Sequence, residues 1–312
     1  MIARLAAHLM RRARHHTLIF HRVLVDRDPM NPSEPTADWF RHLAAMLATN
    51  FRLISLDEAV RRSSCGDLPG RTVSVTFDDG YADNYTVAMP ILAEFGIPAT
   101  FFVASGFIDG GRMWNDSIIE TMRRLHAGRH ELDLPDRSHV TLTDWHSRRE
   151  AASLIIAAWK HLEPADRQAR VDQLSARVNG LPTDLMLTTQ QLRALAAAPA
   201  STIGGHTRLH PILASLSDAQ AREEIERGRR ELEETIQTDV TLFAYPNGKR
   251  GKDYRAEHAE MVRQAGFRAA VATDWGTLDA ATDRFEIPRF TPWHSNLDRF
   301  SVDLARCHFG LI

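Results

Sequence analysis

The chain has 312 residues, 44% of them hydrophobic, and its 38 basic and 40 acidic side chains leave a formal net charge of -2 at pH 7. A chain of this length can bury one large core or two modest ones, and its near-neutral charge, with no long basic stripe, excludes an electrostatic case for nucleic acid as a partner. Its two cysteines, Cys65 and Cys307, lie far apart without metal-type spacing, so neither a disulfide framework nor a cysteine zinc site is expected.

The first ten residues combine basic side chains with short apolar runs. They form neither a convincing secretion signal nor a transmembrane segment, and we therefore expect the protein in the cytoplasm. Ile2, Leu5 and Leu9 fall on one face of a helix whose arginines lie elsewhere. Two interpretations follow: a helix that packs against the body of the domain, or peripheral contact with an anionic membrane surface.

Short β-rich runs then alternate with helical patterns, which predicts βα units around a parallel sheet. Helical apolar spacing covers 38–49, 82–95, 218–236 and 255–265, and Ser55 with Glu58 resembles a capping box that opens another short helix. The expected strands are 17–20, 73–77, 99–104, 201–205, 241–245, 269–273 and 285–290.

Residues 106–187 break this rhythm. They contain helix-like segments at 115–127, 148–162 and 166–178 and a hairpin formed by "HELDL" and "HVTLT". We interpret the stretch as a mainly helical insertion within a single catalytic domain that spans residues 1–312. Long insertions at the loops of an α/β barrel often cover or shape an active site.

Polar residues recur where the predicted strands end. His21 follows 17–20, Asp78 and Asp79 follow 73–77, His206 follows 201–205, and Arg289 lies in the last strand. The carboxyl ends of parallel strands face a common rim, and active sites are built there. We therefore expect these side chains to converge.

The motif "GGHTRLHP" sharpens this expectation. His206 and His210 are four residues apart, so a helical turn after Thr207 would direct both imidazoles to one point. Two imidazoles and a carboxylate, for which Asp79 is the natural choice, make a set of three metal ligands with open positions for water and substrate. Alone, an HxxxH spacing is more often a pair of surface histidines, and a "DDG" is more often a turn with an Asx cap. Here both motifs follow strands of the same alternating pattern.

Taken together, "TFDDG", "HTRLHP" and "FAYPNG" resemble the successive motifs of the polysaccharide deacetylases, the NodB-homology or carbohydrate esterase family 4 group, and "LIFHRV" resembles the subgroup of poly-N-acetylglucosamine deacetylases. The likeness covers about residues 17–105 and 188–292. It implies an α/β fold, a distorted (β/α)7-type barrel, that hydrolyses the N-acetyl group of an amino sugar in a cell-surface polysaccharide or its precursor.

The resemblance also implies roles for single residues. Asp79, His206 and His210 would hold one divalent ion, zinc in the first place, with Co2+ or Ni2+ as alternatives. Asp78 would be the general base. Many members brace that base with an arginine at the position of Ala244, and Arg289 would take this role here; the alternative is a surface arginine on a barrel strand.

His21 would be the general acid, with His294 in "TPWHS" as its competitor. The backbone N–H of Asn247 would donate to the oxyanion, and Tyr245 would contact the substrate. Trp114 would either stack on the sugar or pack at the base of the insertion.

Two other functions compete with the deacetylase. One is the same metal chemistry on a different amide, in a deformylase or a small-molecule amidohydrolase. The other is a non-catalytic carbohydrate-binding module, which would have no use for a spare base beside its ligands. The sequence makes no prediction of the oligomeric state.

Overall fold

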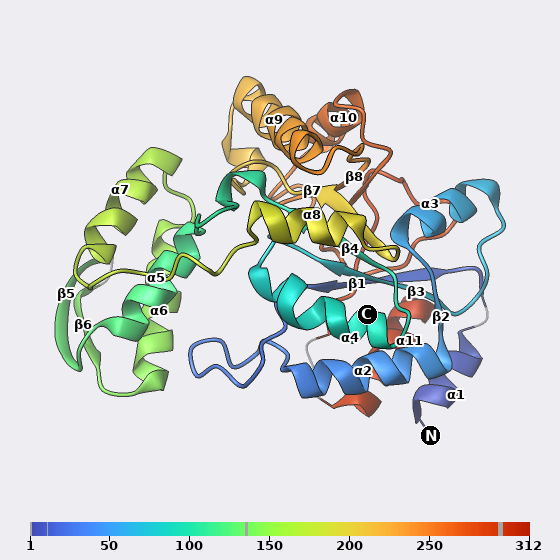
Figure 1. Ribbon diagram of the computed structural model, residues 1–312, viewed down its shortest axis with the longest axis horizontal. Helices are drawn as coiled ribbons and strands as arrows, with labels where there is room; N and C mark the ends of the chain where they lie inside the picture. The colour runs from blue at the N-terminus through green and yellow to red at the C-terminus, as the bar shows by residue number, and fades with distance from the viewer. Residues whose placement is uncertain (1, 11, 135–136, 293–295) are drawn as a thin grey trace.

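A curled parallel sheet lies at the centre of the computed structural model, which describes residues 2–10, 12–134, 137–292 and 296–312 (Figure 1). Its strand order is β1-β3-β4-β7-β8-β9, and the short β2 also pairs with β3. The strands are β1 (His15–Phe20), β2 (Arg52–Leu53), β3 (Thr72–Phe77), β4 (Ala99–Val103), β7 (Ser201–Gly205), β8 (Leu242–Ala244) and β9 (Ala269–Val271). The predicted distorted barrel is confirmed.

The expected seventh strand, 285–290, is not a continuous strand, and this is a correction. The segment makes single parallel bridges, Ile287 with Val271 of β9 and Phe290 with Leu18 of β1. Between them lies Pro288, which has no N–H to donate to a ladder. The segment still joins the two edges of the sheet, because Phe290 N donates to Thr17 O at 2.8 Å.

Helices surround this sheet, and the predicted ones are present with small shifts at their ends. The segment expected as one helix over 82–95 begins instead with a π-helical turn, and the α-helix that follows has Pro90, which cannot donate an i→i−4 bond, as its second residue. Outside the insertion the helices are α1 (Ile2–Leu9), α2 (Ala37–Asn50), α3 (Leu56–Cys65), η1 (Asn84–Ala88), α4 (Met89–Glu94), η2 (Ser105–Phe107), α8 (Thr189–Ala197), η3 (Leu213–Ser215), α9 (Asp218–Ile236), α10 (Ala256–Gln264) and α11 (Leu297–Phe309).

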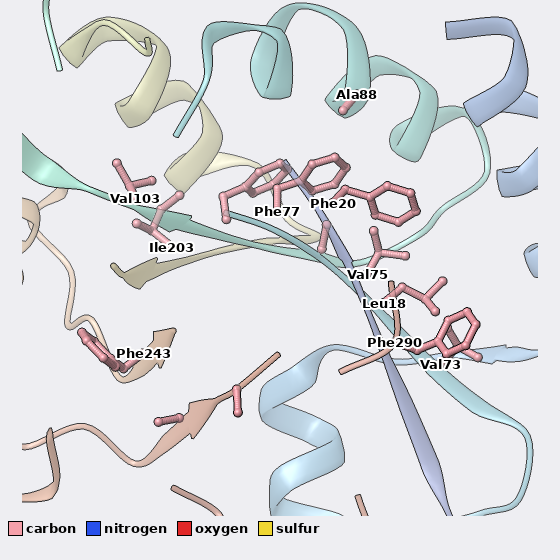
Figure 2. Packing of buried hydrophobic residues seen from close by; sticks show 14 of the residues in the cluster. Leu18, Phe20, Val73, Val75, Phe77, Ala88, Val103, Ile203, Phe243 and Phe290 are labelled. Carbon is pink, nitrogen blue, oxygen red and sulfur yellow. The ribbon is translucent and has the colours of Figure 1, made fainter. Parts of the chain in front are cut away.

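The main core lies between the sheet and the helices that cover it. Phe20, Phe77 and Phe101 come from three neighbouring strands, and their stacked rings have centroid distances of 5.6 and 5.2 Å. Figure 2 shows Phe20 and Phe77 directed toward Ala88. This packing holds the ends of β1 and β3 side by side, and the functional residues follow directly after these ends.

The insertion forms a separate lobe, which lies at the left of Figure 1. It consists of α5 (Trp114–Arg124), the antiparallel hairpin β5 (Gly128–Leu134) and β6 (Arg137–Leu142), α6 (Trp145–Trp159) and α7 (Pro164–Ser175). Its buried side chains, with Ile155 fully enclosed, form their own apolar cluster, to which Met30 is added from the barrel. The two ends of the insertion lie side by side, because Asp109 N donates to Leu187 O at 3.1 Å. The chain therefore returns to the barrel close to the point where it left.

Helix α1 packs against the body of the protein through Ala6 and Ala7, next to α11. Its other face is open, with Ile2, Leu5 and Leu9 exposed to 40%, 60% and 54%. Among the described residues, no helix combines the length and the apolar character that crossing a bilayer requires.

Because the insertion has a core of its own, Ile155→Ala should weaken it selectively. The cavity left behind costs about 2–5 kcal/mol of unfolding free energy. Native-state hydrogen exchange should show lost protection in α5, α6 and α7, with little change in β3 and β4. Glu150→Ala, at an exposed position of the same helix, is the control. An equal loss of protection in the barrel strands would contradict a separate core.

Candidate active site

The two adjacent aspartates at the end of β3 have different backbone conformations. Asp78 N donates to Phe20 O at 2.9 Å and so continues the β1–β3 ladder by one residue. Asp79 then has φ 79° and Gly80 has φ 88°. A non-glycine residue in this region is uncommon and is typical of functional sites that the surrounding structure holds in place. The chain reverses there and separates the environments of the two carboxylates.

The loop after β7 brings His206 and His210 together, but not by the expected helical turn. The chain bends instead, with φ 61° at Thr207 and φ 54° at His210. Thr207 stabilises the bend, because its Oγ1 accepts from His210 N at 3.1 Å. The imidazole ring centroids lie 4.8 Å apart. The convergence inferred from the spacing is present, with a local structure that the spacing did not predict.

Helix α9 supports this bend from behind. Glu224 Oε2 accepts from the backbone N–H groups of Arg208 and Leu209 at 3.1 and 2.7 Å. One turn further along, Gly228 lies so close that a Cβ there would stand 2.6 Å from the carbonyl carbon of Thr207. The close approach of the helix therefore requires glycine at this position.

Asp79, His206 and His210 together form a set of potential metal ligands. One ligand atom from each lies within 4.8 Å of the others. Asp79 Oδ1 lies 3.4 Å from His206 Nε2 and 3.3 Å from His210 Nε2. This oxygen is buried without a hydrogen-bond partner among the described residues. An orphaned carboxylate oxygen between two imidazoles fits a divalent cation, which would satisfy all three atoms.

His210 has the protonation state that a metal ligand needs, whereas the pKa of His206 is raised overall, so that a cation would have to displace its proton. His206 Nδ1 lies 2.7 Å from Ala244 O, which orients the ring and assigns its proton to Nδ1, leaving Nε2 as a ligand. Burial opposes a charge on His206, while the charge of Asp78 raises its pKa. Burial also lowers the pKa of His210 to about 4, so this ring is neutral near pH 7, as a metal ligand must be.

Asp78 is held by a buried ion pair with Arg289. Arg289 Nη1 and Nη2 each donate at 2.7 Å to one carboxylate oxygen of Asp78, and the side chain of Arg289 is fully buried. Arg289 Nε donates in addition to Ala272 O at 2.8 Å. Burial, the largest single influence, favours the neutral acid, but the charge and the hydrogen bonds of Arg289 together with the charge of His206 outweigh it and lower the pKa of Asp78. The arginine lies where a bracing residue was expected, and not at the surface.

His21 lies at the rim of the same cavity as Asp79 and His210, with an exposed ring. Its backbone is held by the helix that follows Asp79, since Asn84 Nδ2 donates to His21 O at 2.9 Å. Its competitor His294 falls outside the described residues.

Of the other candidates, Asn247 and Trp114 line the cavity. Asn247 has φ 60°, and no acceptor among the described residues takes its backbone N–H, which therefore remains available as a donor. The prediction that Tyr245 contacts the substrate is wrong. Its ring is fully buried and stacks on Tyr254 with the ring centroids 3.8 Å apart, and its hydroxyl donates to Phe285 O. It belongs to the core and cannot touch a substrate.

The cavity has a volume of about 330 Å³, and the insertion supplies a large part of its wall. Sequence reasoning did not propose Asp116 as a wall residue. This carboxylate of α5 is buried and accepts from the Tyr81 hydroxyl at 3.0 and 3.2 Å. Burial raises the pKa of Asp116 to about 7. No sequence signal marks such a residue, because it stands in an ordinary amphipathic helix.

The comparisons with known proteins agree with this geometry. A family model described as polysaccharide deacetylase matches residues 66–161 and 167–270, which is well over half of the chain. The chain belongs to the polysaccharide deacetylase family. The matched residues include Asp78, Asp79, His206 and His210, and membership assigns the protein to the carbohydrate de-N-acetylases, enzymes that use a divalent metal. No curated protein matches it in sequence.

Solved structures of deacetylases share the fold at low identity. The deacetylase PplD of Streptococcus pyogenes, in complex with acetate, has a TM-score of 0.60 at 18% identity over 89% of this chain and 92% of that one. A de-N-acetylase of Aggregatibacter actinomycetemcomitans has a TM-score of 0.59 at 17% identity, over 92% and 99%. IcaB of Ammonifex degensii has a TM-score of 0.57 at 19% identity, over 92% and 97%.

The different surroundings of the two aspartates predict an asymmetry. Asp79→Asn should lose the metal, because an amide replaces the central anionic ligand, while its backbone tolerates asparagine at positive φ. Asp78→Asn should keep the metal and lower kcat by roughly 10²–10⁴-fold. Metal content per protein after dialysis and steady-state kinetics measure the two effects, with circular dichroism as a control for folding. Equal metal loss in both variants would contradict separate roles.

Gly228→Ala should weaken metal binding from a distance. Alanine normally stabilises a helix relative to glycine by about 1 kcal/mol, but here its Cβ would displace the Thr207 backbone that positions both histidines. We expect metal affinity to fall by about 10–100-fold, as for other supporting residues. Competition with a chelating dye measures this, with Arg230→Ala on the exposed side of α9 as the matched control. Unchanged affinity would show that the bend does not depend on α9.

Proposed function

We propose that the protein is a metal-dependent hydrolase that removes the N-acetyl group from an amino sugar of a cell-surface polysaccharide or its precursor. One observation carries the proposal: an orphaned oxygen of Asp79 faces two imidazole nitrogens, while the neighbouring Asp78 is held apart by Arg289. A ligand set and a separate base are the two things that hydrolysis of an amide by activated water requires.

Asp79, His206 and His210 would hold the ion, with zinc as the first choice for one carboxylate and two imidazoles. When bound, a divalent ion would polarise the amide carbonyl and lower the pKa of a water molecule. All three side chains are positioned by the fold itself, through the turn at Asp79 and the bend at Thr207.

Asp78 would act as the general base. The positive charge of Arg289 keeps its carboxylate ionised, and a carboxylate oxygen has lone pairs beyond the one that accepts from the guanidinium. Asp78 would take one proton from the attacking water as the water oxygen bonds to the acetyl carbon. The buried ion pair fixes the direction of the carboxylate, so little reorganisation precedes the proton transfer.

The remaining steps need a hydrogen-bond donor and an acid. The free backbone N–H of Asn247, held at φ 60°, would donate to the developing oxyanion. His21, in the same cavity, would protonate the amine nitrogen as the bond between carbon and nitrogen breaks. Acetate and the free amino sugar leave. Trp114 lines the cavity from the insertion, where it also packs against the apolar cluster of that lobe.

Two rivals predict different outcomes. A binding module would gain nothing from a second carboxylate that is braced at the cost of burying an arginine. A deformylase or small-molecule amidohydrolase would use the same ligands on a smaller amide. The cavity of about 330 Å³, with an aromatic wall, supports a sugar substrate instead.

The test is release of acetate from N-acetylglucosamine oligomers by the zinc-loaded protein. We expect turnover that a chelator abolishes and that added zinc restores, because the ion would hold both water and carbonyl. Formylated amines serve as the matched alternative substrate. Activity that resists the chelator would refute the metal mechanism, and release of formate without acetate would favour the deformylase.

A further inference from the structure

The insertion places two cationic side chains in the wall of the active-site cavity. Lys160 follows the end of α6, and Arg167 lies in the first half of α7. Both line the same cavity as Asp79, His210 and His21, and both are half-buried. The mechanism proposed above uses neither.

A hydrogen bond joins the Arg167 side chain to the backbone of Lys160. Arg167 Nη1 lies 3.3 Å from the carbonyl oxygen of Lys160 and donates to it. The Arg167 guanidinium also stacks over Trp114, with its central carbon 4.8 Å from the ring centroid. Stacking orients the guanidinium plane but uses none of its N–H groups, so most of its five donors stay available.

Within the part of the chain that the structure describes, neither cation has an acidic partner. No carboxylate of the described residues forms an ion pair with Lys160 or Arg167. Among the described residues, three carboxylates line the cavity. Asp116 accepts from Tyr81, Asp79 faces the two imidazoles, and Glu34, which is half-buried, forms no ion pair with Lys160 or Arg167. Burial lowers the pKa of Arg167, and no neighbouring acid compensates for it.

Two cationic side chains in one partly desolvated cavity wall, without an ion-pair partner among the described residues, cost free energy unless an anion compensates for them. We propose that Lys160 and Arg167, with Trp114 beneath the guanidinium, form an anion-binding subsite, and that the substrate carries a phosphate or a carboxylate beside its N-acetylated sugar. The identity of the substrate rests on the proposed deacetylase function, whereas binding of an anion to Lys160 and Arg167 can be measured without the reaction. A planar guanidinium and an ammonium group suit the oxygens of either anion.

Three substrates separate the possible sources of the anion. They are neutral N,N′-diacetylchitobiose, N-acetylglucosamine 1-phosphate, and a disaccharide of N-acetylglucosamine and glucuronic acid. With the zinc-loaded protein we expect kcat/KM on at least one charged substrate to exceed that on the neutral one by about tenfold or more, the scale of one charge-assisted hydrogen bond. The preferred charged substrate identifies phosphate or carboxylate.

Lys160→Gln and Arg167→Gln test the residues. Each should lower kcat/KM on the preferred charged substrate by about tenfold, through KM with kcat unchanged, and leave the neutral substrate within about twofold. Arg129→Gln, which removes an exposed charge from β5 of the same insertion outside the cavity, is the control and should change nothing. An equal effect on charged and neutral substrates, or no preference in the wild type, would overturn the subsite.

A binding measurement distinguishes failure of the subsite from failure of the reaction. Calorimetry measures the affinity of zinc-loaded wild type and of zinc-loaded Lys160→Gln for N-acetylglucosamine 1-phosphate and for the glucuronic acid disaccharide. Because both proteins contain zinc, direct contact of an anion with zinc contributes equally to both affinities. Weaker binding of one anion by the variant, without acetate release from any sugar, would keep the subsite and refute the deacetylase. Acetate release, together with equal binding of both anions by wild type and variant, would keep the deacetylase and refute the subsite.

Discussion

A buried ion pair between Arg289 and Asp78 connects the closure of the barrel to its chemistry. Arg289 belongs to the irregular segment that bridges β9 and β1, and Asp78 is the first residue after β3. Two hydrogen bonds of 2.7 Å join them, and both side chains are almost wholly buried. Breaking such a pair would leave an uncompensated buried charge, so the segment that joins β9 to β1 and the position of Asp78 are energetically linked.

This pair also explains how two adjacent carboxylates are tolerated at one strand end. The charge of Asp78 is compensated by Arg289 within the protein, whereas Asp79 faces two imidazoles with one oxygen unsatisfied. The reversal of the backbone at Asp79 directs the two side chains to these different partners. One carboxylate is thereby suited to proton transfer and the other to a cation, although they are neighbours in the chain.

The insertion contributes differently, because it has its own core and touches the chemistry only at the cavity wall. The barrel supplies the potential ligands, the proposed base and the histidine at the rim, while the insertion supplies Trp114, Lys160 and Arg167. A division of this kind lets the reaction stay constant while the insertion selects what enters. Among the residues that the structure describes, no carboxylate of the barrel forms an ion pair with Lys160 or Arg167.

Much of the fold and part of the site could be predicted from the sequence. Apolar periodicity indicated most helices and strands, although it missed α8, α11 and β2. Asp79, His206 and His210 were recognisable because ligand types recurred where strands end. Such patterns report local structure. They failed at Thr207, where a bend replaces the helical turn, and at 285–290, where Pro288 interrupts the ladder.

Other features were decided only by the tertiary structure. Arg289 meets Asp78 across 211 residues of sequence, Tyr245 turns into the core although it stands in a functional motif, and Lys160 approaches Arg167 by the packing of two helices in the insertion. The physical reason is the same in each case. A residue type and its spacing determine which groups are offered at a strand end or helix face, but burial and charge compensation depend on segments that only folding brings together.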